Sequence, residues 1–247
     1  MSEPLAQHLR RLRRTGRRAD ALALLDTACA QRPKDATLAR WAWQHQAFWW
    51  EPVQGRTVRL RRRGPIDAAL LRRCWGDRDF MQRFHRLAKP LPADDGALHE
   101  ALLREYWAIP EESGAMHWTI ERQGRGCGFI SVVEWSLPQR RAELLIGLPE
   151  PEGWTATEAA HLAIQWLAQR AAVERLSACF YANNLVAQRQ AEHLGFEREG
   201  VLRGHFREPD GRRTDLHLAG LLLNVDFFRR TERLRQRVLG AGLAVKP

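Results

Sequence analysis

The sequence predicts an α+β fold with a small all-helical extension at its N-terminus. Helical periodicity fills residues 4–50, three strand-like segments follow one another in the middle of the chain, and strands then alternate with helices before a closing pair of strands. With 247 residues, 45% of them hydrophobic, the chain can bury one sizeable core and carry an appendage. We expect a helical extension over residues 1–52, a main domain over residues 56–225, and a C-terminal helix and tail over residues 226–247.

The extension is predicted to contain three helices. Leu5, Leu9 and Leu12 repeat at helical spacing, a second helical run ends before Pro33, and a third ends near Trp50. The order of Gly, Ala, Leu and Pro in the second run resembles one tetratricopeptide-like helical pair, which cannot bury its own apolar face. We therefore expect the extension to pack on the following domain or on a partner. The aromatic residues available for this contact are Trp41, Trp43, Trp49 and Trp50.

The main domain is predicted from alternation in its strands, from helical periodicity and from Gly or Pro at the ends of elements. Gly64-Pro65 ends the first strand, and Asp210-Gly211 is a hairpin signal between the last two. The expected strands are 57–63, 116–122, 128–135, 141–148, 176–182, 197–208 and 213–223. The expected helices are 67–75, 77–87, 97–107, 157–171, 185–193 and 226–239.

The net charge of +10 raises the question of a nucleic-acid partner. Nearly all of the 39 basic residues are arginines, a bias typical of codon composition as much as of selection for phosphate, and they are spread along the chain. We interpret the densest run, Arg10 to Arg18, as a solvated helix face. Nucleic acid is therefore not the expected partner, and an RNA-associated role rests on charge alone. The charge does favour acidic partners, such as CoA phosphates, nucleotide sugars or an acyl carrier protein.

Cysteine spacing and hydropathy narrow the class of protein further. Cys29, Cys74, Cys127 and Cys179 are far apart, and no His/Cys cluster has zinc spacing, so we expect apolar cysteines and no metal. No apolar run approaches the roughly 20 residues of a membrane span. The N-terminus has no apolar signal-peptide core. We expect a cytoplasmic monomer or homodimer with no membrane partner.

Three short motifs, in this order, carry a family resemblance. They are Ala142 to Ile146 on a strand, Ala156 to Ala159 at a helix start, and Asn183 to Phe196, which is followed by Glu199-Gly200. Over about residues 56–223 the chain resembles the GNAT acyltransferases, and within them the ribosomal-protein N-terminal acetyltransferases. The resemblance implies a GNAT fold, a mostly antiparallel, splayed sheet flanked by helices. It also implies an N-acyltransferase that moves an acyl group, with acetyl-CoA as the first expected donor, to a primary amine by direct attack in a ternary complex.

The resemblance also implies where the acyl-CoA donor binds. The thioester would lie between two splayed strands, and the pyrophosphate would sit on the N–H groups of a helix N-terminus. Here the sequence departs from the family, because the phosphate loop keeps only Gly153 of two glycines and is about two residues shorter. This leaves open a lost or altered CoA site, or a donor such as a longer acyl-CoA or an acyl carrier protein. Asn184 would approach the pantetheine arm, or cap the helix that follows it. The expected donor-binding residues are Leu145, Ile146, Leu148, Gly153, Trp154, Thr155, Ala156, Thr157 and Asn184.

The resemblance supplies no catalytic base, because Cys179, Ala187 and Ala191 stand where relatives carry Glu, Ser and Tyr. Strand alternation can aim Glu134 or Glu143 into the cleft, so we take these two carboxylates as candidate general bases. Trp135 is an apolar neighbour that would raise the pKa of Glu134, and His117 and His85 are further candidates. Tyr181 would donate a proton to the leaving thiolate or merely pack.

The acceptor pocket is expected under the early helices, residues 66–87. The amine would belong to a small molecule, an amino sugar or a protein N-terminus. A non-catalytic binding protein of the same fold, with a vestigial phosphate loop, is the alternative. The residues expected to contact the acceptor are Trp75, Phe84, His85 and His117, with Phe80 and Trp107 as further candidates.

Overall fold

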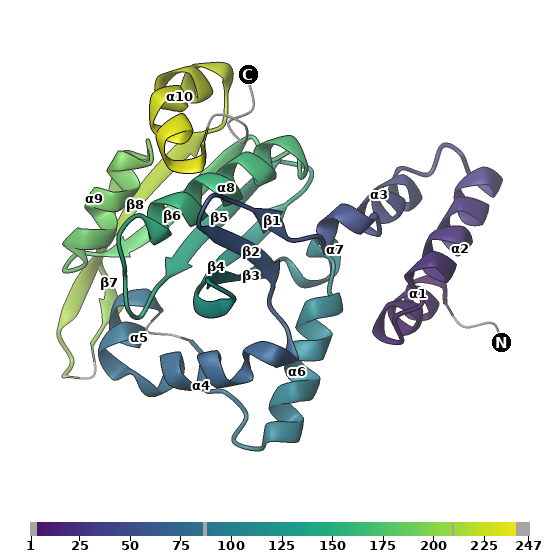
Figure 1. Cartoon of the computed structure of the whole chain (residues 1–247), viewed down its shortest axis with the longest axis horizontal. Helices are drawn as coiled ribbons and strands as arrows, with labels where there is room; N and C mark the ends of the chain where they lie inside the picture. The colour runs from purple at the N-terminus through teal and green to yellow at the C-terminus, as the bar shows by residue number, and fades with distance from the viewer. Residues whose placement is uncertain (1–3, 86–87, 209, 241–247) are drawn as a thin grey trace.

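An eight-stranded sheet forms the centre of the protein (Figure 1). The computed structural model describes residues 4–85, 88–208 and 210–240. Within them the strands lie side by side in the order β1-β2-β3-β4-β5-β6-β8-β7, and all neighbours are antiparallel except β5 and β6. The strands are β1 (Val53–Gln54), β2 (Val58–Arg62), β3 (Met116–Arg122), β4 (Arg125–Ser136), β5 (Arg141–Gly147), β6 (Arg175–Tyr181), β7 (Glu197–Arg207) and β8 (Arg213–Leu222).

Helices cover both faces of the sheet and form the extension. α8, α9 and α10 share the core on one face with Val132 and Leu176, whereas α4, α5 and α6 pack around Phe129 on the other face. The helices are α1 (Leu5–Arg14), α2 (Arg18–Gln31), α3 (Ala36–Gln44), α4 (Ala68–Gly76), α5 (Arg78–Phe84), α6 (Asp95–Trp107), α7 (Pro110–Ser113), α8 (Thr155–Gln169), α9 (Leu185–His193) and α10 (Val225–Leu239), with short 3₁₀ turns η1 (Ala47–Trp49) and η2 (Pro65–Asp67). The predicted α+β class is confirmed.

β5 and β6 start as parallel neighbours and then separate. Their pairing covers Arg141 to Glu143 opposite Arg175 to Ser177, although the strands continue to Gly147 and Tyr181. We call the unpaired part, residues 144–147 and 178–181, the β5–β6 split. β4 pairs with the edge of β5 that faces away from the split, and β8 pairs with the corresponding edge of β6. The backbone groups that face into the split have no strand partner there and are available to a ligand.

Most predicted elements are present with ends shifted by a few residues. α8 begins at Thr155, two residues before the predicted start, because the Trp154 carbonyl already accepts the Glu158 N–H at 2.8 Å. α5 ends at Phe84, and residues 86–87 of its predicted span lie outside the described residues. β1 and α7 were not predicted, since a strand of two residues and a helix of four are too short to show periodicity.

The extension docks on the main domain through aromatic residues. The Trp49 side chain is buried, and its ring centroid lies 5.2 Å from that of Trp166 and 5.7 Å from that of Trp135. The Trp50 indole N–H donates to the Tyr106 carbonyl at 2.8 Å, and the Trp50 ring centroid lies 6.0 Å from that of Trp107 on α6. The expected tryptophan contact is thus confirmed for Trp49 and Trp50. Trp43 packs against Trp49, with ring centroids 4.9 Å apart, whereas Trp41 packs within the core of the extension itself.

The third predicted helix is shorter than expected. α3 ends at Gln44, well before Trp50, and η1 follows it. The side chains of His45 and Trp49 hydrogen-bond the carbonyls of Trp41 and Trp43, at 2.6 and 2.9 Å. These bonds satisfy carbonyls of the last turn, where the helix ends and the chain turns toward the sheet.

Candidate active site

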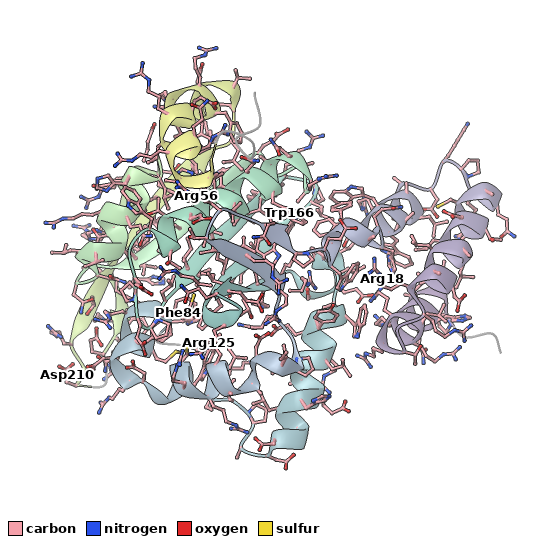
Figure 2. All side chains as sticks on the ribbon, in the orientation of Figure 1. Arg18, Arg56, Phe84, Arg125, Trp166 and Asp210 are labelled. Carbon is pink, nitrogen blue, oxygen red and sulfur yellow. The ribbon has the colours of Figure 1, made fainter. Side chains whose placement is uncertain are left out.

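The ends of four secondary-structure elements meet at the β5–β6 split. They are the C-terminal ends of β5, β6 and α5 and the N-terminal end of α9. At the end of β5, Gly147 lies against α5, where an added Cβ would come within 2.8 Å of Phe84 and 2.9 Å of Phe80. Asn184 donates a hydrogen bond from Nδ2 to the Arg83 carbonyl at 3.1 Å, which ties α9 to α5. Figure 2 shows Phe84 between α5 and the sheet.

Asn184 is the N-cap of α9. Its Oδ1 accepts the Ala187 N–H at 3.3 Å, so the capping role expected from sequence is present. The carboxamide keeps a second N–H and a second lone pair beyond these two bonds. It therefore retains the capacity to bond an amide ligand that enters the split.

Glu143 stands at the last pair before the split. Its half-buried carboxylate accepts a hydrogen bond from the Cys179 thiol on β6. Burial raises the pKa of Glu143, the Glu134 charge adds to this shift, and the Cys179 hydrogen bond opposes it. A raised carboxylate pKa moves toward the neutral range that suits a general base.

The Cys179 thiol is a hydrogen-bond donor to Glu143 and not a nucleophile. Burial and the adjacent carboxylates of Glu143 and Glu134 raise the pKa of the Cys179 thiol to about 12. The thiol therefore stays protonated at neutral pH and acts as a hydrogen-bond donor, because only the thiolate is a good nucleophile.

Glu134 lies in an irregular part of β4, where the register with β5 shifts. Its φ of 48° is in the left-handed region that favours glycine, and its side chain is 67% exposed, 4.0 Å from Arg141. Trp135 does not cover it, because that ring is buried in the core beside Trp49. Glu134 therefore acts on Glu143 as a nearby charge and is itself open to solvent.

Tyr181 ends β6 on the same side as Cys179, since it follows two residues later. Its ring packs edge-on against Phe206 of β7, with centroids 5.4 Å apart. Its carbonyl accepts the Asn184 N–H at 2.9 Å. These contacts fix the Tyr181 ring at the open end of the split.

His117 lies on β3 beneath α6. Its Nδ1 is 2.8 Å from the Ser131 hydroxyl, and a nearby ion pair joins Arg63 to Glu105 through two bonds of 2.6 Å. Burial, reinforced by Arg63 and opposed by Glu105, lowers the pKa of His117 to about 3. The imidazole is therefore neutral at physiological pH and cannot serve as an acid there.

The other expected acceptor residues are divided between two places. His85 caps the C-terminus of α5 beside the split and is exposed. Trp75 packs 5.8 Å from Phe129 and donates its N–H to the Lys89 carbonyl at 2.9 Å. Trp107 lies away from the split, with its ring 6.0 Å from Trp50 at the extension.

The expected phosphate loop leads into the first turn of α8. Thr155 is buried, and Trp154 is 55% exposed with the Arg237 guanidinium 5.5 Å above its ring. The N–H groups at the start of α8, around Ala156 and Thr157, have no acceptor within their own helix. They lie at the positive end of the helix dipole. This is a suitable position for a phosphate, although only Gly153, at φ 51°, offers a glycine conformation.

The expected donor-binding residues on β5 lie along the split. Leu145 and Ile146 follow Glu143 and pair on their other edge with Ser131 and Ile130 of β4. Ile146 and Leu148 send their side chains against the main core, so at these two positions the backbone groups are what a ligand could bind.

Sequence reasoning missed three participants at this site. Cys179 was recognisable, because it occupies the position of a family carboxylate, but its bond to Glu143 required the strand register. Arg83 contributes only its carbonyl, and Arg237 comes from α10, outside the motifs, so neither left a signal in the sequence. In the described part of the chain, no cluster of three or more His, Cys, Asp or Glu residues is arranged to hold a metal. Among the same residues, no helix is long and apolar enough to cross a membrane.

Comparisons with known proteins identify the family. A family model described as acetyltransferase (GNAT) domain matches residues 57–197. No curated protein is significantly similar to the chain in sequence.

Solved structures of similar fold include a GCN5-related N-acetyltransferase from Brucella melitensis, with 21% identity, TM-score 0.61, and coverage of 78% of this chain and 87% of that one. A spermidine N-acetyltransferase from Vibrio cholerae, in complex with CoA and spermine, has 19% identity, TM-score 0.57, and coverage of 68% and 96%. An acetyltransferase from Salmonella typhimurium that modifies the N-terminal serine of ribosomal protein L7/L12 has 13% identity, TM-score 0.60, and coverage of 70% and 100%. At these identities the likeness establishes the fold. Because the family model spans more than half of the chain, the protein belongs to the GNAT acetyltransferase family.

Proposed function

We propose that this enzyme transfers an acetyl group from acetyl-CoA to a primary amine, by direct attack in a ternary complex, with Glu143 as the general base. The observation that carries this proposal is the position of Glu143. It is half-buried with a raised pKa, at the point where β5 and β6 separate. In this proposal the N-terminus of α8, which follows β5, binds the donor phosphates. The free backbone edge of β5 hydrogen-bonds the pantetheine amides.

In the proposed reaction the neutral amine attacks the thioester carbonyl carbon. A C–N bond forms, the C–S bond breaks, and the amine proton passes to Glu143 directly or through water. A β5 backbone N–H near Leu145 or Ile146 polarises the carbonyl oxygen. CoA leaves as the thiolate and is protonated by Tyr181 or by solvent. Alignment of amine and thioester supplies much of the rate.

The acceptor is proposed to be a polyamine-like small molecule, an amino sugar or a protein N-terminus. The names of two structural neighbours, the spermidine acetyltransferase and the acetyltransferase of L7/L12, motivate the first and last of these. Phe84 and His85 at the end of α5 would face the amine, whereas Trp75 and His117 would shape the layer beneath it. The tetratricopeptide-like character of the extension, the ribosomal-protein branch, the domain bounds and a cytoplasmic location stay predictions.

A thiol-release assay with acetyl-CoA and a panel of amines tests the function. Glu143→Gln is expected to lower kcat/KM by about 100-fold or more, the usual contribution of a general base. Glu100→Gln, an exposed carboxylate on α6, is the matched control and should have no effect.

Calorimetry with acetyl-CoA, longer acyl-CoAs and an acyl carrier protein separates enzyme from binding protein. If none of these donors binds at physiological concentration, the acyltransferase proposal fails. If the wild type is active and Glu143→Gln is equally active, the assignment of the base fails while the reaction stands.

A further inference from the structure

A strongly basic pocket lies where the extension meets the main domain, far in the sequence from the residues of the split. It has a volume of about 270 Å³ and lies between α1 and the α6–α7 segment. We call it the junction pocket. The residues of its wall that matter here are Arg10, Arg13, Arg14, Arg104, Trp107 and Glu112.

The junction pocket contains the basic run that the sequence singled out. Arg10, Arg13 and Arg14 are spaced at i, i+3 and i+4, so α1 carries them on one face. The expectation of a solvated helix face holds for Arg10 and Arg14, which are exposed, but is wrong for Arg13, whose side chain is only 2% exposed. Burial of Arg13 against α6 and α7 turns this face of α1 toward the main domain.

Arg13 is the structural floor of the pocket. Its Nε donates to the Trp107 carbonyl at 3.0 Å, and its Nη2 donates to Glu112 at 2.6 Å. Its remaining nitrogen contacts His45. These bonds engage all three nitrogens of Arg13, and its side chain is nearly buried, so we assign the ligand to the more exposed arginines.

Negative charge around the pocket falls short of the positive charge. Glu112 is the carboxylate on the described pocket wall; it is committed to Arg13 and lies 3.9 Å from Arg10. Arg104 has the Glu100 carboxylate at 3.9 Å, outside the pocket wall. Within the described residues, Arg14 has no carboxylate in ion-pair range. Three arginines therefore surround the opening with little compensation.

The titration of Arg13 is consistent with this imbalance. Burial lowers the pKa of Arg13, Glu112 opposes the shift, and the charges of Arg10 and Arg14 add to it. The arginines of α1 thus repel one another, and an anion among them would relieve that repulsion.

We propose that the junction pocket binds a phosphate-bearing ligand, held by Arg10, Arg14 and Arg104. Arginine forks match phosphate oxygens in a bidentate geometry. A pocket of about 270 Å³ admits a phosphate or diphosphate group, which brings two or more negative charges into a small volume. Acidic side chains would need to enter several at a time to supply the same charge. Because the arginines come from both parts of the chain, the bound phosphate would link the extension to the main domain.

Titration calorimetry with sodium pyrophosphate tests the proposal. Arg14 and Arg104 lie outside the expected phosphate loop at the start of α8, so changing them alters the junction pocket and leaves that loop intact. At low salt Arg14→Gln/Arg104→Gln should weaken pyrophosphate binding at least about tenfold relative to the wild type. Arg212→Gln/Arg233→Gln removes the same charge from exposed positions away from the pocket and should leave the affinity within about twofold.

Further measurements complete the test. Hydrogen exchange should slow at residues 5–14 and 95–113 in the wild type when pyrophosphate binds. ADP distinguishes the source of the phosphate: tighter binding than pyrophosphate supports a nucleotide packed on Trp107, and equal binding supports the phosphate group alone. The proposal is overturned if pyrophosphate does not bind at low salt, binds both double variants equally, or binds no better than citrate. The thiol-release assay without pyrophosphate reports separately on the acyltransferase function.

Discussion

Replacement of Asn184 by Ala should separate the structural and the ligand-binding roles of this residue. The change removes the cap of α9, which costs about 1 kcal/mol of unfolding free energy, and the bond to the Arg83 carbonyl, which costs about 1 kcal/mol more. A loss of about 2 kcal/mol corresponds to a decrease in Tm of about 4–8 °C for a chain of this size. If the carboxamide also bonds the pantetheine, kcat/KM for acetyl-CoA should fall at least about tenfold.

Two control variants distinguish these effects. Asn224→Ala removes the cap of α10, where Oδ1 accepts the Phe227 N–H at 2.9 Å, and should cost about 1 kcal/mol without changing kcat/KM. Asn184→Asp keeps a capping oxygen but lacks the N–H donor, so it should recover part of the stability and none of the donor binding. Thermal denaturation and acetyl-CoA kinetics measure the two effects. An unchanged kcat/KM in folded Asn184→Ala would refute a role for Asn184 in the site.

The remaining predictions concern the base and the extension. Glu134→Gln removes a charge that raises the pKa of Glu143, so the acidic limb of the kcat/KM–pH profile should move to lower pH; a limb that does not move would exclude this coupling. Cys179→Ala removes a hydrogen bond that lowers the same pKa, so the limb should move to higher pH, and a shift the other way would contradict the assigned bond. Arg13→Ala leaves Glu112 and His45 without their partner and should destabilise the protein by about 3 kcal/mol in urea denaturation. Its control, exposed Arg14→Ala, should stay within about 0.5 kcal/mol, and equal effects of both changes would argue against a buried anchor.

The fold was predictable because its signals are local. The segment Asn183 to Phe196 contains a strand end, a capping Asn, a helix and a Gly that stops it, and α9 begins and ends where these residues place it. The predicted start of β3 at Met116 is confirmed for the same reason, since alternation and turn residues act within a few positions. Irregular features had no such signal, as the left-handed backbone of Glu134 and the two-residue β1 show.

The site was only partly predictable, because its chemistry depends on contacts between distant residues. Sequence named Glu134 and Glu143 as equal candidates, and the strand register separates them: one lies in an exposed bulge and the other is half-buried beside Cys179. Burial sets the pKa of a carboxylate, and no local pattern reports it.

The sequence by itself determined the family and the order of elements, since motif spacing and periodicity are local properties of the chain, and it predicted where the donor would bind. Tertiary structure decided which carboxylate is shielded, that Arg13 is a buried anchor within an otherwise exposed basic run, and that Arg104 joins Arg10 and Arg14 at one pocket. Charge and burial at these positions arise where distant segments of the chain come together. Arg13 and Trp107, for example, are in contact although 94 positions separate them in the sequence.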